Sequence, residues 1–354
     1  MDLSIERSLE NFGYAEVVVL LKERQAKAAT ITREASQAAA VATVKDCCLK
    51  EVPNALKGLR ALKRAREVRP FHYFSRLGVC AGFVDRKGAE RLAGLKGIAG
   101  VYPAEQISLI RPVHMTTVKL KKEKLTWGLR VLGVQRLWKE GLTGKGVGVG
   151  HLDTGVDGKH PALRRRIKGF MEFDWNGDPV PKPKPHDTDI HGTHTAGTIC
   201  GGVVRGLAIG VAPEADLYSA IVIEGGRVLV RILSGMEWIL GLNVRVLNMS
   251  LGIRGYNPFF LEVTRRLRED GVLPVFAIGN EGPGTSRSPG NYPEALSVGA
   301  IDPKRHVADF SSSIVFKRPI EPQQPNVVAP GVKVISAIPG GLAAMSGTSM
   351  ATPH

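Results

Sequence analysis

Apolar and polar positions in the first part of the chain follow the short periods of a mixed α and β domain. Strands are predicted at residues 14–21, 71–83 and 97–102, and helices at residues 23–40 and 86–95. The first strand is rich in β-branched residues, the first helix is rich in alanine, and Asp85 can cap the second helix. We therefore expect a small α+β domain with its helices on one face of an antiparallel sheet.

From Gly144 onward the pattern changes to apolar runs separated by longer helical stretches. Strands are predicted at residues 147–153, 215–223, 244–250, 273–280, 295–301 and 332–338, and helices at residues 193–200, 229–240 and 258–270. Strands that alternate with helices predict an α/β domain, with a largely parallel sheet covered by helices on both faces.

The length and composition fit a globular chain of two domains. The chain has 354 residues, 43% of them hydrophobic, and no apolar run reaches the roughly 18 residues of a transmembrane helix. The first residues include acids and lack the apolar core of a signal peptide, so we expect either a protein that stays in the cell or a start that lies upstream. The four cysteines, Cys47, Cys48, Cys80 and Cys200, lack metal-ligand spacing, which favours reduced thiols.

The formal charge of +15 raises the question of a nucleic-acid partner. Basic residues cluster at 57–69, 119–124 and 164–168, but no aromatic-interleaved basic motif accompanies them. Solvated faces and an exposed linker explain these clusters better, so we expect neither a nucleic-acid partner nor a membrane partner.

Three stretches carry side chains suited to nucleophilic catalysis. Asp153 ends a predicted buried strand, where α/β sheets place their chemistry. His191 begins a run of small residues, and a histidine oriented by a buried aspartate can act as a base near neutral pH. Ser349 lies just before Pro353, which fits only if a helix begins close before it.

The chain resembles the subtilisin-like serine proteases (subtilases), which share this order of aspartate, histidine and serine. Four blocks carry the resemblance: HLDTGVD (151–157), HGTH (191–194), AIGNEG (277–282) and GTSMATPH (347–354). Each block alone is weak evidence, but four in the order of the family form a specific signal. The resemblance extends from about Trp127 to the end, and a weaker one covers the N-terminal part.

The resemblance implies a role for each matching residue. Ser349 is expected to be the nucleophile, His191 the general base and then acid, and Asp153 the orienting carboxylate. The Asn280 amide is expected to join the Ser349 backbone N–H in an oxyanion hole, although an asparagine before Glu-Gly also suits a turn. Residues implied to line the substrate groove are Ser250, Leu251, Gly252, Gly225, Ala277 and Gly279. The resemblance implies supporting positions for His194 and Asp157, and we expect His151, His160 and His354 to be structural.

The resemblance also implies a zymogen of inhibitor I9 type. Residues 1–120 are expected to form a propeptide domain with a cleavable linker, and residues 121–354 the catalytic domain. In the family such a propeptide assists folding and then inhibits by placing its C-terminal tail, here residues 103–120, in the cleft. The expected partners are polypeptide substrates and the protein's own propeptide, in a monomer. We expect the protein to cut itself between residues 113 and 127, where the lysine-rich linker is exposed.

Two departures from the family pattern concern metal binding and the last helix. The tight calcium site of many subtilases needs side-chain oxygens where this chain has Ala162 and Val204, so we expect that site to be absent and no cofactor to be required. In the family, the helix that begins at the serine runs on through the core, whereas the sequence stops at His354. We therefore expect the C-terminal part of the catalytic domain to be missing, and this chain by itself to be poorly folded or inactive in that domain.

Charged residues near the expected cleft suggest a specificity. Asp187 and Asp189 precede His191 and either attract a basic side chain or are solvated loop acids. Arg287 is expected near the first pocket, where it would repel a basic residue. The sequence thus predicts a mild basic preference at the second position before the bond and none at the first.

The reading with most support is a serine endopeptidase that forms an acyl-enzyme on Ser349. The alternatives are a catalytically inactive fragment or propeptide-blocked interaction protein, and a basic nucleic-acid-binding module. Only an activated serine reacts with a fluorophosphonate, so that reagent separates the enzyme from the alternatives.

Overall fold

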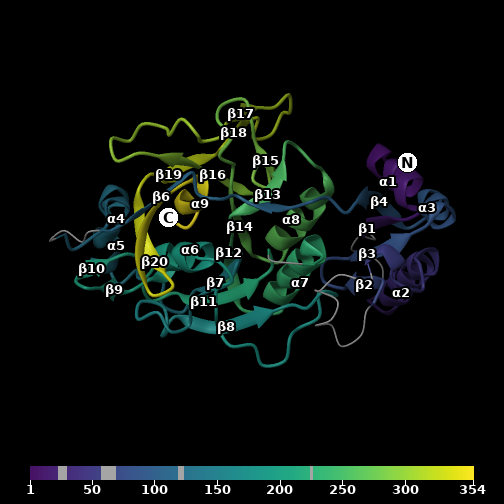
Figure 1. Ribbon diagram of the computed structural model, residues 1–354, viewed down its shortest axis with the longest axis horizontal. Coiled ribbons are helices and arrows are strands. Elements are labelled where there is room, and N and C mark those ends of the chain that lie inside the picture. The colour runs from purple at the N-terminus through teal and green to yellow at the C-terminus, as the bar shows by residue number, and fades with distance from the viewer. Residues whose placement is uncertain (23–29, 57–68, 119–122, 224–225) are drawn as a thin grey trace. The chain divides into compact units, whose positions relative to one another are not determined.

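The computed structural model describes residues 1–22, 30–56, 69–118, 123–223 and 226–354 (Figure 1). The chain forms two compact units. The first comprises Met1–Gln106, Phe173–Pro179 and Gly225–Glu237. The second comprises Ile107–Glu172, Val180–Glu224 and Trp238–His354.

The first unit is built on a four-stranded antiparallel sheet in the order β2-β3-β1-β4. Its strands are β1 (Ala15–Leu21), β2 (Phe71–Phe74), β3 (Val79–Val84) and β4 (Ile98–Pro103). Its helices are α1 (Leu3–Phe12), α2 (Thr30–Cys47) and α3 (Arg86–Ala93), and a short 3-10 turn at Asn54–Leu56 follows α2. The expected small α+β domain with an antiparallel sheet is therefore present.

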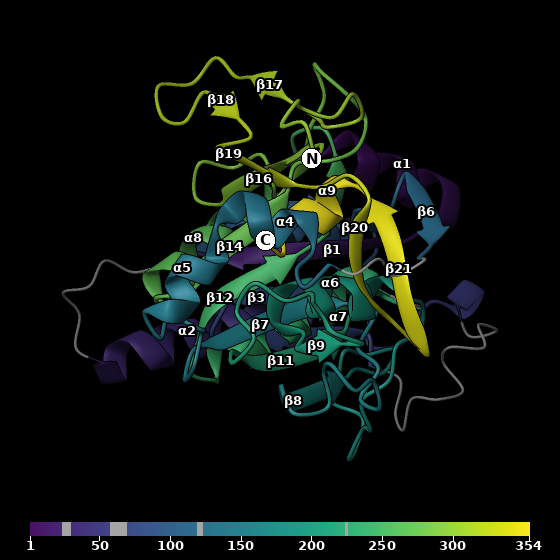
Figure 2. The same cartoon turned by 90° about the vertical axis from the view of Figure 1, so that its left-hand side faces the viewer.

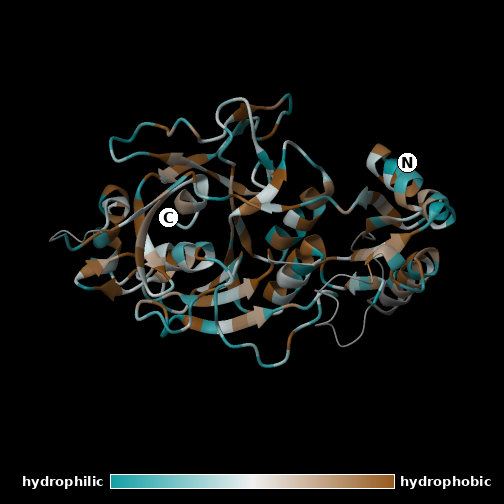
Figure 3. Cartoon of the chain, viewed as in Figure 1, coloured by the Kyte–Doolittle hydropathy of each residue, from teal (hydrophilic) through white to brown (hydrophobic). Residues whose placement is uncertain are grey.

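Two of these helices differ from the sequence prediction. The helix expected at residues 23–40 is observed as α2, Thr30–Cys47, and residues 23–29 lie outside the described part of the chain. Helix α1 was not predicted; Asp2 caps it by accepting a hydrogen bond from the Ser4 N–H, and it combines hydrophilic and hydrophobic residues (Figure 3). The predicted Asp85 cap of α3 is confirmed, because its side chain accepts from the Gly88 N–H at 2.7 Å.

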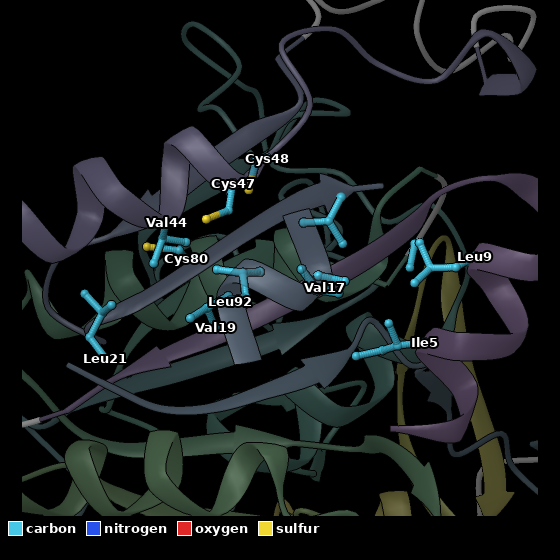
Figure 4. Close-up of a cluster of buried hydrophobic side chains, with 13 residues drawn as sticks. Ile5, Leu9, Val17, Val19, Leu21, Val44, Cys47, Cys48, Cys80 and Leu92 are labelled. Atoms are coloured by element: carbon cyan, nitrogen blue, oxygen red, sulfur yellow. The ribbon is translucent and has the colours of Figure 1, made fainter. Parts of the chain in front are cut away.

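The core of the first unit fills the space between the sheet and its helices (Figure 4). Val17, Val19 and Leu21 alternate along β1, as expected for one face of a strand, and Leu92 of α3 packs with them. The cluster also contains the thiols of Cys47, Cys48 and Cys80. All four cysteines of the chain are buried and free, which confirms the predicted reduced thiols.

Segments from the later part of the sequence complete this unit. Glu237, in helix α7 (Val228–Leu240), accepts hydrogen bonds from the Ser75 hydroxyl and from the Arg76 and Leu77 N–H groups in the turn between β2 and β3. The Arg227 guanidinium pairs with Glu16 at 2.6 Å and lies over the rings of Phe83 and Trp175. Paired charge and aromatic faces compensate for burying this arginine.

The second unit is built on a seven-stranded parallel sheet in the order β19-β16-β14-β12-β7-β11-β8. Its strands are β7 (Gly148–Asp153), β8 (Ile167–Glu172), β11 (Asp216–Ile221), β12 (Val244–Met249), β14 (Leu273–Ala277), β16 (Leu296–Ile301) and β19 (Val327–Pro330). Helices α6 (His191–Cys200), α8 (Phe259–Glu269) and α9 (Thr348–Ala351) pack against it. Every residue of β7 is buried, as is typical of a central parallel strand. The α/β fold is confirmed.

The last predicted strand belongs to a different sheet. Residues 332–338 were expected among the parallel strands, but β20 (Val334–Ile338) pairs antiparallel with β21 (Gly341–Ser346). A tight turn at Pro339 and Gly340, the latter with φ of 79°, reverses the chain. Strand β6 (His114–Thr117) adds to the free edge of β21, and Figure 2 shows it beside the yellow hairpin.

The remaining elements are short. They are β5 (Ser108–Leu109), α4 (Trp127–Leu132), α5 (Val134–Lys139), β9 (Val203–Val204), β10 (Leu207–Ala208), β13 (Leu251–Arg254), β15 (Arg287–Ser288), β17 (Ile314–Val315) and β18 (Gln323–Gln324). Among the described residues, no helix has the length and apolar character needed to cross a membrane.

Candidate active site

The carboxyl ends of the parallel strands bring the predicted site residues to one edge of the sheet. Asp153 ends β7 opposite Ile221 of β11, and Ser250 directly follows β12, the strand on the other side of β7. Asn280 lies just beyond the end of β14. Ligands of open α/β sheets bind at such carboxyl edges.

Asp153 and His191 form a buried hydrogen-bonded pair. The His191 Nδ1 lies 2.8 Å from the Asp153 Oδ1, and the two residues are 1% and 0% exposed. The Thr154 N–H donates to the same oxygen at 2.7 Å, and the Thr195 hydroxyl donates to Oδ2 at 3.2 Å. Burial raises the pKa of Asp153, but His191, His151 and the Thr154 N–H together hold the pKa below its usual value. The Asp153 side chain is therefore a carboxylate at neutral pH.

The second ring nitrogen of His191 is available for chemistry. His191 Nε2 is buried and has no hydrogen-bond partner among the described residues. Because Nδ1 faces a carboxylate, the neutral ring carries its proton on Nδ1 and leaves Nε2 as a base. Thr195, one turn further along α6, was not singled out from the sequence, although the i,i+4 spacing places it on the same face as His191.

Ser349 lies near the start of α9, which begins one residue earlier than predicted. The residue is fully buried, and its Oγ donates a hydrogen bond of 2.5 Å to the carbonyl oxygen of Ile110. Helices α6 and α9, which carry His191 and Ser349, pack against each other. The structure thus places a serine hydroxyl directly against a peptide carbonyl.

Asn280 uses both ends of its side-chain amide. Its Oδ1 accepts from the Thr348 N–H and the Thr348 hydroxyl, both at 2.8 Å. Its Nδ2 donates to the carbonyl oxygen of Arg111 at 3.0 Å. The acceptor side therefore fixes the amide to the start of α9, and the donor side faces a peptide carbonyl, one residue after the carbonyl that Ser349 contacts.

The segment from Ser108 to Thr117 lies within the expected tail of residues 103–120, and from here on we call this shorter segment the tail. It pairs with β13 through β5 and with β21 through β6. Strand β5 of the tail pairs antiparallel with β13, with Leu109 opposite Leu251 and Ser108 opposite Gly252. The Ile110 N–H donates to the Ser250 carbonyl at 3.0 Å. Three residues predicted to line the groove, Ser250, Leu251 and Gly252, therefore bind an extended peptide through the main chain.

Among the described residues, the other predicted groove positions do not pair with the tail through the main chain. Ala277 ends β14 and Gly279 follows it, and both are buried. Gly279 adopts a φ of 124°, and a side chain there would meet the Glu281 carboxylate, so glycine is required. Gly225 lies outside the described residues.

Arg287 lies beneath the start of the tail. Its Nη1 donates to the Ser108 hydroxyl at 2.8 Å and to the Gly252 carbonyl at 3.2 Å, while its Nε donates to Glu281 at 2.9 Å. The Glu281 Oε2 in turn accepts from the Asn280 N–H at 3.1 Å. Burial raises the pKa of Glu281, but Arg287, Arg254 and the Asn280 N–H together lower the pKa below its usual value. The roles of Glu281 and Thr348 were not foreseen, because only folding brings these contacts together.

The histidines that were expected to be supporting or structural have internal partners. The His151 ring contacts the hydroxyls of Ser219 and Thr195, and the His160 Nε2 contacts the Gly341 carbonyl. The His194 Nε2 lies 3.0 Å from the Val334 carbonyl, and the His354 Nδ1 lies 2.9 Å from the Met350 carbonyl. The Asp157 carboxylate accepts from the Lys159 N–H in the loop after β7.

The described residues hold no group of three or more histidine, cysteine, aspartate or glutamate side chains that would bind a metal ion. Ala162 and Val204, which the resemblance put at the calcium positions of the family, carry no side-chain oxygen.

Comparison with known proteins gives the family. The sequence profile of the subtilase family (Peptidase S8) matches residues 144–354. The chain is 36% identical to the "Intracellular serine protease" of Paenibacillus polymyxa over 259 residues, which cover 69% of this chain and 76% of the relative. It is 33% identical to the "Major intracellular serine protease" of Bacillus subtilis (strain 168) over 65% of this chain and 72% of the relative. It is 35% identical to "Subtilisin E" of the same organism over 66% of this chain and 59% of the relative. The chain therefore belongs to the subtilase family and is a subtilisin-like serine endopeptidase.

Proposed function

We propose that Ser349, His191 and Asp153 are the catalytic triad of this endopeptidase and that the chain is its propeptide-inhibited zymogen. The Ser349 Oγ attacks the carbonyl carbon of a peptide bond while His191 Nε2 takes the hydroxyl proton. Asp153 holds the ring through Nδ1 and stabilises the imidazolium that forms. Collapse of the tetrahedral intermediate breaks the C–N bond, and His191 passes its proton to the leaving amine. Water, deprotonated by His191, then releases the acyl group and restores Ser349.

The observation that carries this proposal is the position of Ser349 against the Ile110 carbonyl. The peptide N–H of the same residue is held by Ser250, and the residues before it pair with β13. An extended peptide, a nucleophile, a free histidine nitrogen and a buried carboxylate thus occur in one unit. Asn280 is assigned to the oxyanion hole, because its Nδ2 faces a carbonyl of the same peptide.

The zymogen proposal rests on the tail occupying the groove. The Asn280 amide binds the Arg111 carbonyl, whereas Ser349 contacts the Ile110 carbonyl, so the two groups address neighbouring peptide bonds. A bond is cleaved efficiently only when its own carbonyl receives the oxyanion donors. We therefore infer that the tail is bound as an inhibitor.

The test is active-site labelling combined with casein hydrolysis. After removal of the N-terminal domain, the protein is expected to react with a fluorophosphonate and to cleave casein, and Ser349→Ala should abolish both. Ser336→Ala is the matched control, since this serine is equally buried and its hydroxyl has no partner among the described residues. Labelling that persists in Ser349→Ala would refute the assignment of the nucleophile.

A further inference from the structure

The carboxylate of Asp189 is held by backbone hydrogen bonds next to the catalytic histidine. Its Oδ1 accepts from the Ile190 N–H at 2.6 Å and from the His191 N–H at 3.3 Å, at the start of α6. Backbone donors at the first turn of a helix are otherwise unpaired, so they fix one oxygen of a nearby carboxylate. The other oxygen, Oδ2, is not used by these backbone donors.

In this structure Asp189 Oδ2 forms an ion pair with the side chain of Arg111. The Arg111 Nη1 donates to Asp189 Oδ2 at 2.9 Å, and the two side chains are 64% and 23% exposed. Burial raises the pKa of Asp189. The backbone N–H of Ile190 and the Arg111 guanidinium more than offset this and lower the pKa below its usual value, so the carboxyl group is ionised at neutral pH. The pair is thus a charged contact between the enzyme and its bound peptide.

The position of Arg111 in the peptide defines which subsite this is. Ser349 contacts the carbonyl oxygen of Ile110, so Ile110 occupies the place of the residue before the cleaved bond. Arg111 is the next residue and occupies the place directly after that bond. Asp189 therefore lies on the leaving-group side of the groove.

Asp187, the other acid expected near the cleft, does not share this role. Its carboxylate accepts from the Thr154 hydroxyl and from the N–H and hydroxyl of Thr193, at distances of 2.6–2.7 Å. The Asp189 N–H also donates to it, at 3.0 Å. Asp187 therefore organises the loop that presents Asp189.

We propose that Asp189 is a specificity-determining residue that favours a basic side chain immediately after the cleaved bond. The proposal rests on the proposed function, because it takes the Ile110 carbonyl as the guide to where the bond lies. An exposed ion pair contributes modestly, so we expect about a two- to fivefold preference in kcat/KM rather than strict selection.

The experiment compares two peptides that differ only in the residue after the cleaved bond, arginine or glutamine, with isoleucine before it. The activated enzyme should cleave the arginine peptide about two- to fivefold faster, and high salt should remove most of the difference. In Asp189→Asn the ratio should fall to about one. A ratio measured on one enzyme cancels any general loss of activity caused by altering the helix start.

Asp216→Asn serves as the matched control. Asp216 forms a comparably exposed ion pair with Lys168, at 3.6 Å, but begins β11 at the opposite edge of the sheet from Asp153. This variant removes the same charge and should keep the preference. If the activity of Asp189→Asn is too low to measure, the inference is tested by the salt dependence of the arginine-to-glutamine ratio in the unaltered enzyme.

The outcomes separate this inference from the proposed function. Equal rates for the two peptides, or a basic preference before the bond instead of after it, would overturn the role of Asp189 and leave the endopeptidase intact. Loss of fluorophosphonate labelling and of all peptide cleavage in the activated, unaltered enzyme would overturn the proposed function itself.

Discussion

Asn280 offers a test of transition-state stabilisation because its amide oxygen binds Thr348, whereas its amide nitrogen binds a carbonyl oxygen of the tail. Asn280→Asp keeps an oxygen for the Thr348 N–H and hydroxyl but replaces the N–H donor by an acceptor. In subtilisin itself, loss of the corresponding donor lowers kcat by about 10²–10³. We expect a fall of that order with little change in KM, measured by steady-state hydrolysis of a chromogenic peptide.

The control for Asn280→Asp compares the change in its affinity for the tail peptide with the change in its kcat. Affinity for the isolated tail peptide should change far less than kcat, because β13 and Ser250 supply most of the main-chain hydrogen bonds. A variant that loses affinity and kcat in equal proportion would show that Asn280 serves ground-state binding.

The residues of the candidate site could be named from sequence more readily than their surroundings. Asp153, His191 and Ser349 fall in motifs, so their chemistry and order were visible. Their partners, such as Thr348 for Asn280 and Glu281 for Arg287, come from distant or unremarkable positions, and only tertiary folding brings them into contact. The two acids before His191 looked equivalent in sequence, but Asp189 pairs with Arg111 of the tail, whereas Asp187 accepts hydrogen bonds from Thr154 and Thr193.

At the scale of elements, the periodic strands were predicted well and the edge strands were not. Strand β7 is a continuous apolar run and was found, whereas β8 (IKGFME) is only partly buried at the sheet edge and mixes charged residues with glycine. Strand β20 was found but assigned to the wrong sheet, because strand direction and partners depend on the turn at Pro339 and Gly340 and on the tail. Periodicity reports burial, and it does not report pairing.

The tail gives a prediction about processing. Residues 114–117 of β6 are all exposed, and Val113 is 40% exposed, whereas Ile110 is 1% exposed. Exposed segments are cut in preference to buried ones, so the first cut by the protein's own activity is expected between residues 113 and 127.

N-terminal sequencing of the active enzyme measures the position of that cut, and Ser349→Ala should remain uncut. A mature protein that begins at Arg111 would instead mean that Ser349 cleaves the bond it contacts. A mature protein that still begins at Met1 would refute the propeptide proposal.

At the scale of the whole molecule, buried histidines make stability depend on pH. Burial lowers the pKa of His194 to about 3 and that of His354 to about 4, below the ordinary value near 6.5. Below pH 6.5 the unfolded chain takes up protons that the folded chain cannot, so the free energy of unfolding should fall as the pH decreases from 6.5 toward 4. Each such histidine contributes a slope of about 1.4 kcal/mol per pH unit.

Urea unfolding at several pH values measures this slope. His354→Gln should make it shallower, while His306→Gln, at a side chain that is 75% exposed, should leave it unchanged. Unfolding midpoints that do not change between pH 6.5 and 4.5 would contradict the prediction.

If the proposed cut takes place, the distribution of the buried thiols makes it measurable by counting cysteines. Cys47, Cys48 and Cys80 lie in the core of the first unit, and Cys200 lies in α6 of the second. Burial raises the pKa of Cys48 and Cys200 to about 12, so these thiols stay unreactive while the protein is folded. A cut within residues 113–127 separates three cysteines from one. Thiol titration in denaturant would then give four equivalents for the precursor and one for the isolated mature enzyme, whose single sulfur is a ready position for attaching one probe per molecule.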